Sequence, residues 1–317
     1  MAMHRLAARS YSPTALQHYA ACPYKFFLQA VHRLAPREVP DPIDELDPLQ
    51  RGSLIHDIQL ELFERLRGRR LLPVRPANLE QAREVLEAVI REVASRHYDD
   101  LAPAIDRIWE DSVAAIRADL REWLRRASED QSGYIPWRFE LSFGLEHRDE
   151  RRADPASVPA AVRLDCGLQL RGAIDLVERH AAGLLRVTDH KTGKAQAKTD
   201  QVVAGGSSLQ PVLYALVAEK LFGATGKVEC GRLYFCTSTG GFAEHVVPLD
   251  QAARAAAGTV AATVGDAIAG PFLPAAPQKR ACEWCDYRVV CGPYEELRSG
   301  RKPQQRIEPL LRLRELP

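Results

Sequence analysis

The chain has no hydrophobic run long enough to cross a membrane. None of its apolar stretches approaches the roughly 18 residues that a membrane-spanning helix needs, and no apolar signal region follows the opening Met-Ala-Met-His-Arg. Net charge is also nearly absent, because 43 Lys and Arg stand against 42 Asp and Glu, which leaves +1. We therefore expect a soluble, cytoplasmic protein without a membrane partner. Its overall charge does not decide whether it binds nucleic acid.

Two further absences concern ATP and repeats. The phosphate loop of many ATPases, G-x4-G-K-[ST], does not occur, and Gly223-Ala224-Thr225-Gly226-Lys227 lacks both its spacing and its hydroxyl residue. We therefore expect no ATP site in this chain, which excludes a helicase motor. The sequence also has no internal repeat. Its 317 residues, 46% of them hydrophobic, are ordinary for a globular protein with a sizeable core.

Two predicted strands, 172–177 and 184–191, form a hairpin with acids on both arms. Both are rich in β-branched and aliphatic residues, and a turn sequence separates them. Because strand side chains alternate, Asp189 and Lys191 should project to the same side, and cross-strand pairing can bring Asp175 beside them. Two carboxylates and an ammonium can hold a hard divalent cation and orient a water, as metal-assisted phosphodiester hydrolysis requires. A surface cluster of salt bridges is the alternative.

Apolar residues at helical spacing predict helices on both sides of this hairpin. A helix over residues 50–66 places His56 beside its apolar stripe, where a buried, hydrogen-bonded histidine is the simpler interpretation. A second helix over 209–222 puts Gln210 and Tyr214, four residues apart, on one face.

The remaining pattern continues the mixture of strands and helices, which indicates an α/β fold. Residues 135–145 alternate apolar and polar side chains without a slip, which predicts a half-buried strand with Glu140 on its polar face. Ser12 precedes a proline and should cap a first helix, and Asn78 should cap a helix that reaches about residue 98. Further helices are predicted over 104–126 and 250–268, and a further hairpin over 228–237 and 242–247.

Two groups of basic residues have more than one interpretation. The arginines of the 104–126 helix either line a nucleic-acid path or form a solvated charged face: Arg107, Arg117, Arg121, Arg125 and Arg126. The tail after Gly300 is either a basic arm for phosphates or a solvated end, with Arg301, Lys302, Arg306, Arg312 and Arg314.

Three of the seven cysteines stand close together near the end of the chain. Cys282, Cys285 and Cys291 follow the pattern C-x2-C-x5-C, which packing does not require and which suits an iron-sulfur or zinc centre. Three thiolates need a fourth ligand. Cys22 lies just before a proline-initiated helix, where a lone cysteine is most often core filler.

Six short motifs occur in an order that resembles the PD-(D/E)XK nuclease superfamily. They are S-P-T-A-L with C-P-Y-K-F-F, G-S-L-I-H, G-A-I-D, D-H-K-T-G, Q-P-V-L-Y and the cysteine pattern. The resemblance is to the RecB-like branch, and specifically to the iron-sulfur nuclease domains of AddB-type helicase-nuclease subunits. It implies a restriction-endonuclease-like core, in which helices flank a central mixed β-sheet, with a helical insert in the N-terminal part and a C-terminal iron-sulfur segment.

The resemblance also implies a domain layout. The whole chain, 1–317, would be one nuclease domain. Its parts would be N-terminal helices carrying Cys22 and His56 (about 10–70), a helical insert (about 70–130), a nuclease core (about 134–270), an iron-sulfur segment (about 278–295) and a basic tail (300–317).

Residue by residue, the resemblance implies two sites. His56, Asp175 and Asp189 would coordinate catalytic Mg²⁺ or Mn²⁺, and Lys191 would be the catalytic lysine. Gln210 and Tyr214 match the Q-x3-Y motif that supports the site and touches nucleic acid. Glu140 is a possible further acid near the metal, and an exposed or lysine-paired carboxylate is the alternative. The four 4Fe-4S ligands would be Cys22, Cys282, Cys285 and Cys291.

The implied function is metal-dependent hydrolysis of DNA. We expect single-strand exonuclease activity in DNA repair or recombination, beside a helicase partner, in a stand-alone nuclease or a module of a larger helicase-like polypeptide. Arginines and aromatic side chains such as Trp137 or Tyr214 would contact unpaired bases. The alternatives are a non-catalytic iron-sulfur module that binds nucleic acid or senses its ends, and a nuclease that carries zinc in the four-cysteine site.

Overall fold

A five-stranded mixed sheet forms the centre of the fold. The computed structural model describes residues 1–35, 43–145, 153–195 and 200–317. The strand order is β1-β4-β5-β6-β7, in which the β5–β6 pair is parallel and the other three pairs are antiparallel. The strands are β1 (Tyr134–Phe143), β4 (Gly172–His180), β5 (Leu184–Lys191), β6 (Lys227–Phe235) and β7 (Glu244–Pro248), with a separate small sheet of β2 (Val162–Arg163) and β3 (Gln169–Leu170).

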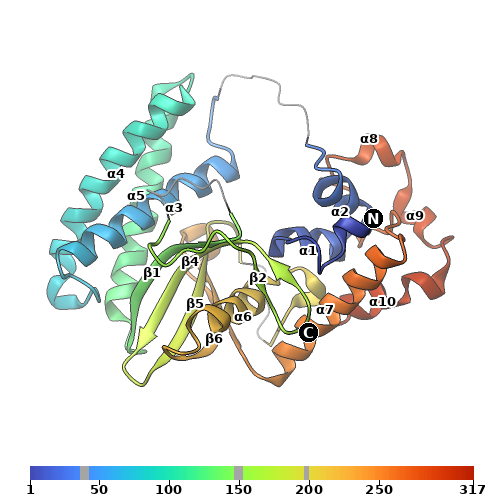
Figure 1. The fold of residues 1–317 in the computed structure, drawn as a ribbon. Coiled ribbons are helices and arrows are strands. Elements are labelled where there is room, and N and C mark those ends of the chain that lie inside the picture. The colour runs from blue at the N-terminus through green and yellow to red at the C-terminus, as the bar shows by residue number, and fades with distance from the viewer. Residues whose placement is uncertain (36–42, 146–152, 196–199) are drawn as a thin grey trace.

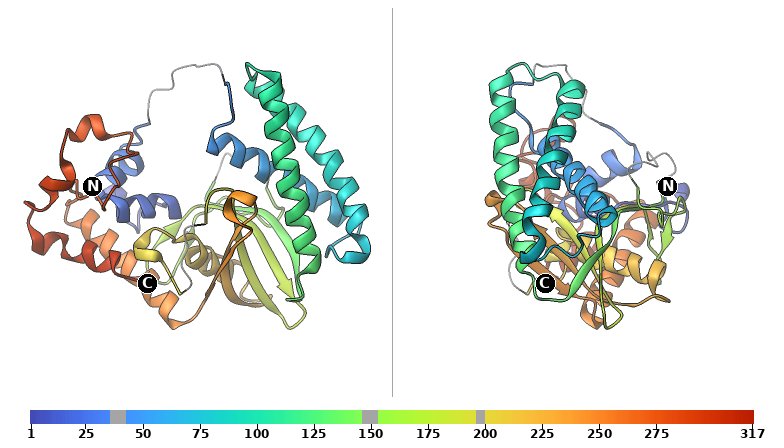
Figure 2. Two further views of the ribbon diagram at one scale, coloured as in Figure 1. Left: turned by 180° about the vertical axis from the view of Figure 1, so that it is seen from behind. Right: turned by 90° about the vertical axis from the view of Figure 1, so that its left-hand side faces the viewer.

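Helices cover both faces of this sheet (Figure 1 and Figure 2). On one face, α6 (Gln210–Phe222) and α7 (Gln251–Ala269) share a core with strand residues such as Val187. On the other, α3 (Pro48–Gly68), α4 (Leu79–Leu101) and α5 (Asp106–Glu129) form a second core with residues such as Leu176. The two cores separate because strand side chains point alternately to opposite faces. The predicted α/β fold with a mixed central sheet is confirmed.

The remaining helices gather beside the sheet, on the side away from α4 and α5 (Figure 1). Both chain ends lie there, so residues far apart in the sequence become neighbours. No helix in the described parts of the chain is long and apolar enough to span a membrane. These helices are α1 (Pro13–Ala21), α2 (Pro23–Phe26), α8 (Arg288–Cys291), α9 (Glu295–Ser299) and α10 (Gln304–Arg314).

The hairpin predicted between residues 172 and 191 is present. Leu176 pairs with Thr188 across β4 and β5, which sets Asp175 and Asp189 opposite each other on the next pair of positions. The first helix also begins as predicted, because Ser12 Oγ accepts a hydrogen bond of 3.1 Å from the backbone N–H of Ala15.

Asn78 is the N-cap residue of α4, as predicted, but its side chain makes no hydrogen bond to the first turn of the helix. Asn78 Oδ1 accepts from the backbone N–H of Arg75 at 2.7 Å, and its Nδ2 donates to the carbonyls of Leu71 and Pro73. The amide therefore closes the turn before α4. A sequence cannot separate these two uses, because Asn bonds neighbouring backbone groups equally well in turns and at helix ends.

The unbroken alternation predicted for β1 is wrong. The pairing of β1 with β4 shifts register between Pro136 and Arg138, and Glu140 adopts a left-handed backbone with φ of +50°. Both features change where the side chains of β1 point.

The arginines of α5 whose contacts are described pair with acids of the helical layer. These contacts favour the solvated charged face over the nucleic-acid path. Arg117 and Arg121 pair with Glu87 of α4, and Arg125 and Arg126 pair with Glu122 of α5 itself.

The basic tail is neither a free arm nor a solvated end over residues 304–314. This segment is α10, which buries Ile307, Leu310 and Leu313 in the first core. Arg314 closes the helix and donates to the carbonyls of Ala20 (2.8 Å), Ala21 (3.0 Å) and Ala276 (2.7 Å).

Candidate active site

Three side chains from three elements converge at one end of the sheet. His56 of α3, Glu140 of β1 and Asp175 of β4 place one ligand atom each within 4.8 Å of the others. His56 Nδ1 lies 3.6 Å from Asp175 Oδ2 and 3.9 Å from Glu140 Oε1. Two carboxylates with an imidazole form a donor set that suits a divalent cation such as Mg²⁺ or Mn²⁺.

The irregular backbone of β1 positions Glu140. Its neighbours Phe139 and Leu141 pair with Leu176 and Ile174, so Glu140 stands opposite Asp175. A left-handed backbone is unfavourable for a residue with a side chain, by about 1–3 kcal/mol, and persists only where surrounding contacts impose it. Asp154 supplies such contacts: its carboxylate accepts from Phe139 N at 3.2 Å and its N–H donates to the carbonyl of Glu140 at 3.3 Å.

Asp175 has a raised pKa. Burial, with the nearby carboxylates of Asp189 and Glu140, raises the pKa of its carboxyl to about 7, against the opposing effect of His56. The backbone N–H of His190 donates to Asp175 Oδ2 at 2.7 Å and fixes its direction. Crowded, buried carboxylates are stabilised in their charged form by a cation, so these residues fit a divalent metal ion.

Beside this group, Lys191, Asp189 and Gln210 form a closed ring of polar contacts. Lys191 Nζ lies 2.7 Å from Asp189 Oδ2 and donates to Gln210 Oε1 at 2.7 Å, while Gln210 Nε2 donates to Asp189 Oδ1 at 3.0 Å. The ring joins the end of β5 to the first residue of α6 and fixes the direction of the ammonium group. Asp189 is therefore adjacent to the three converging residues without being one of them, and its role as a metal ligand stays a prediction.

Tyr214 and Trp137 do not offer free faces to unpaired bases, contrary to the sequence-based expectation. Tyr214 is 6% exposed and packs edge-on against Phe143, and burial raises the pKa of its hydroxyl. Its hydroxyl lies against the start of β4, where a Cβ at Gly172 would stand 3.3 Å from the oxygen. Trp137 packs against Phe222, with the Arg138 guanidinium over its ring at 4.4 Å.

The four predicted cysteine ligands lie together at the other side of the molecule. Cys22, Cys282, Cys285 and Cys291 all line one cavity of about 560 Å³. Burial, together with the neighbouring thiols Cys22, Cys285 and Cys282 and the carboxylate of Glu295, raises the pKa of Cys291 to about 11. Thiols that crowd in this way are stabilised as thiolates by a positively charged metal centre, so the residues fit such a group.

The three remaining cysteines lie elsewhere. Cys230 and Cys236 are buried at β6, and Cys166 is partly buried beside the first core.

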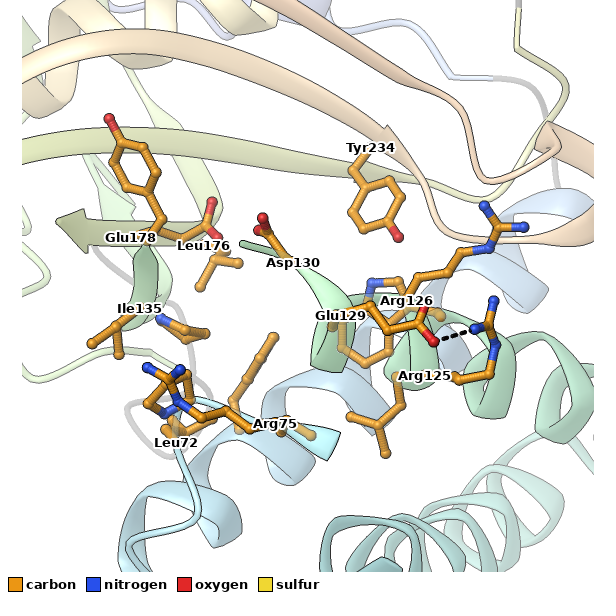
Figure 3. Close-up of a pocket in the computed structure, with 18 of the residues that line it drawn as sticks. Leu72, Arg75, Arg125, Arg126, Glu129, Asp130, Ile135, Leu176, Glu178 and Tyr234 are labelled. Atoms are coloured by element: carbon orange, nitrogen blue, oxygen red, sulfur yellow. Dashed lines mark hydrogen bonds and ion pairs between the residues drawn. The ribbon is translucent and has the colours of Figure 1, made fainter. Parts of the chain in front are cut away.

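A buried ionic network that was not predicted from the sequence lies on the face of the sheet that packs against α5. Glu178 accepts from Arg186 Nε at 2.8 Å, from Arg232 Nη2 at 3.0 Å and from Thr188 Oγ1 at 2.7 Å. It borders a cavity of about 430 Å³ between α5 and the sheet, in which Arg125 pairs with Glu129 (Figure 3). The sequence signal that could have predicted this network is the presence of charged residues in or directly after three predicted strands: Glu178 in β4, Arg186 in β5 and Arg232 in β6.

Comparison with known proteins identifies the family. The family model described as the PD-(D/E)XK nuclease superfamily matches residues 10–292. The chain belongs to this superfamily. The match includes every residue predicted for the two sites, and the predicted family is confirmed.

Curated relatives of this nuclease-superfamily chain are much longer proteins. The B subunit of an ATP-dependent helicase/deoxyribonuclease from Carboxydothermus hydrogenoformans is 25% identical over 249 residues, which are 73% of this chain and 20% of that protein. The protein of the same name from Acetivibrio thermocellus is 26% identical over 209 residues, 61% of this chain and 16% of that protein. The chain therefore spans about a fifth or less of the length of these relatives.

Proposed function

We propose that this chain is a divalent-metal-dependent deoxyribonuclease domain. The observation that carries the proposal is the convergence of His56, Glu140 and Asp175 beside the ring of Lys191, Asp189 and Gln210. A binding module has no need for three converging ligands and an oriented ammonium group. Membership of a nuclease superfamily supports the same conclusion.

In this proposal, His56, Glu140 and Asp175 hold Mg²⁺ or Mn²⁺, with Asp189 as a further ligand. When bound, such an ion neutralises phosphate charge and lowers the pKa of a water. Lys191 supplies a fixed ammonium group that orients the attacking water or stabilises the charge that develops on the phosphate. Gln210 keeps Lys191 in place by accepting a hydrogen bond from its ammonium group, and Tyr214 supports the site by packing against the start of β4.

We also propose that Cys22, Cys282, Cys285 and Cys291 bind a 4Fe-4S cluster. All four thiols line one cavity of about 560 Å³, where a positively charged metal centre would stabilise them as thiolates. The resemblance of the motif order to iron-sulfur nuclease domains supports 4Fe-4S over zinc.

The names of the relatives support DNA as the substrate and a helicase partner. To these we add, as our own proposal, single-strand exonuclease activity in repair or recombination and a cytoplasmic location. The length of those relatives supports a module of a helicase-nuclease rather than a stand-alone enzyme.

The experiment is a cleavage assay with the chain purified without oxygen. End-labelled single-stranded, double-stranded and closed circular DNA are incubated with Mg²⁺ or Mn²⁺, beside an EDTA control. We expect cleavage of the end-bearing single strand that EDTA abolishes. Binding of DNA without cleavage under every metal condition would instead support the non-catalytic end-sensing module.

A further inference from the structure

A groove of about 370 Å³ opens directly beside Lys191 and Gln210. One wall comes from Gln17 of α1, and another from described residues between β5 and α6, among them Lys194, Ser207 and Ser208. Among the described residues that line it are two lysines and neither Asp nor Glu. Lys191 is paired with Asp189, so Lys194 supplies the positive charge that the ring at the metal site does not already hold.

Ser208 has a hydroxyl that the described residues do not satisfy. Its Oγ is buried and has no hydrogen-bond partner there, while its backbone N–H donates to the carbonyl of Val203 at 3.2 Å. A buried hydroxyl without a partner is unfavourable by about 1–3 kcal/mol, and a ligand with an acceptor oxygen removes that penalty. Ser208 lines the groove, so rotation of its hydroxyl toward the cavity would let a bound anion accept a hydrogen bond from it.

The wall that carries Ser208 is fixed by close backbone contacts. Gly205 has φ of +63°, and a Cβ there would meet the carbonyl oxygen of Arg314 at 2.6 Å. Gly206 has φ of +84° and lies equally close to Ala20 of α1. Gln17 Nε2 donates to the carbonyl of Ser207, which ties the same wall to α1. The backbone beside Ser207 and Ser208 is thus held in place before any ligand binds.

We infer that this groove binds a phosphodiester next to the scissile one in a nucleic-acid strand. The inference rests on the proposed nuclease function and adds Lys194 and Ser208 as contacts to the strand. Lys191 lines the groove and also belongs to the ring at the metal site, so a strand in the groove continues into the reacting position.

The test measures binding of a labelled single-stranded oligonucleotide to the full chain in EDTA over a range of salt concentrations. Each phosphate contact of a single strand contributes about 0.7 to the slope of log K against log salt. We expect Lys194→Gln to reduce the magnitude of that slope by about 0.7, and Lys194→Arg to preserve it. Ser208→Ala should raise Kd roughly tenfold with the slope unchanged, because the lost hydroxyl is uncharged.

Lys220→Gln is the matched control. Its ammonium group lies near the far end of α6 and pairs with Asp165 at 2.6 Å, so the slope should stay at the wild-type value. Wild-type cleavage with an unchanged slope and Kd in Lys194→Gln and Ser208→Ala would overturn the groove assignment alone. Wild-type protein that neither binds nor cleaves DNA would overturn the proposed function and, with it, this inference.

Discussion

The ammonium group of Lys191 lies 2.7 Å from Asp189 Oδ2, and one residue of β5 separates the two in sequence. Alternate residues of a strand share a face, and Gln210 at the start of α6 bonds to both side chains. A lysine on the strand is thus held by a helix that follows it in sequence. Lys191 and the converging carboxylates can therefore be tested separately.

Removing the ammonium group should stop cleavage without unfolding the chain. We expect Lys191→Ala to lower the single-strand cleavage rate by about 100-fold or more, because no other side chain replaces its positioned donor. The free energy of unfolding should change little, since the Lys191 side chain is partly exposed. Cleavage at the wild-type rate in the purified variant would contradict the assignment.

Removing the carboxylate of Glu140 should weaken metal binding directly. We expect Glu140→Gln to raise the Kd for Mn²⁺ by about tenfold or more, measured by calorimetry, because one of the converging oxygen ligands loses its charge. Glu80→Gln on α4 is the control, since Glu80 is exposed and pairs only with Arg83 in the described structure. Equal affinities in the two variants would exclude Glu140 as a ligand.

Loss of one cluster ligand should remove the visible absorption of the protein. We expect Cys282→Ser to be colourless and to unfold at a temperature several degrees lower, because metal-centre binding contributes to folding. Cys166→Ser, outside the four-cysteine cavity, should keep both properties. A colourless wild-type protein with stoichiometric zinc after anaerobic purification would refute the 4Fe-4S proposal.

The buried network of Glu178 predicts a pH-dependent stability. Burial would raise the pKa of Glu178, but the ion pairs and hydrogen bonds with Arg232, Arg186 and Thr188 outweigh it and lower the pKa from 4.5 to about 2. A lowered pKa stabilises the folded state above the unfolded value of 4.5, and this contribution is lost as the pH falls toward about 2. At neutral pH, Glu178→Gln should destabilise the fold by about 3–5 kcal/mol, because two buried arginines lose their partner.

Urea unfolding at pH 7 and pH 3 measures this effect. The difference in unfolding free energy between wild type and Glu178→Gln should shrink by about 2 kcal/mol at the lower pH. A difference that stays constant would show that the carboxylate of Glu178 titrates alike in both states.

The hairpin and the two helices that serve the active site could be predicted because each has a local signal. Alternation placed Asp189 and Lys191 on one face, and the four-residue spacing of Gln210 and Tyr214 placed both on one side of α6. The spacing did not indicate whether the side of α6 that carries Gln210 and Tyr214 faces solvent or packs against the sheet. Tyr214 is buried because Phe143 of β1 and the start of β4 pack against it.

The arrangement of the carboxylates could not be read from local patterns. Glu140 meets Asp175 through a register shift and a left-handed backbone that depend on Asp154, fourteen positions away in sequence. The ionic network of Glu178 likewise depends on partners in β5 and β6. Both are products of tertiary packing, which sequence periodicity does not encode.

Arg314 has a consequence for how the cysteine site assembles. One guanidinium binds the carbonyls of Ala20 and Ala21, directly before Cys22, and that of Ala276, directly before the terminal cysteine segment. The protein thus closes the long loop between these two regions with its own backbone and one side chain. A metal centre that binds here finds its four thiols already close together, because the entropy cost of closing the loop was met during folding. Loss of that metal centre therefore need not open the loop.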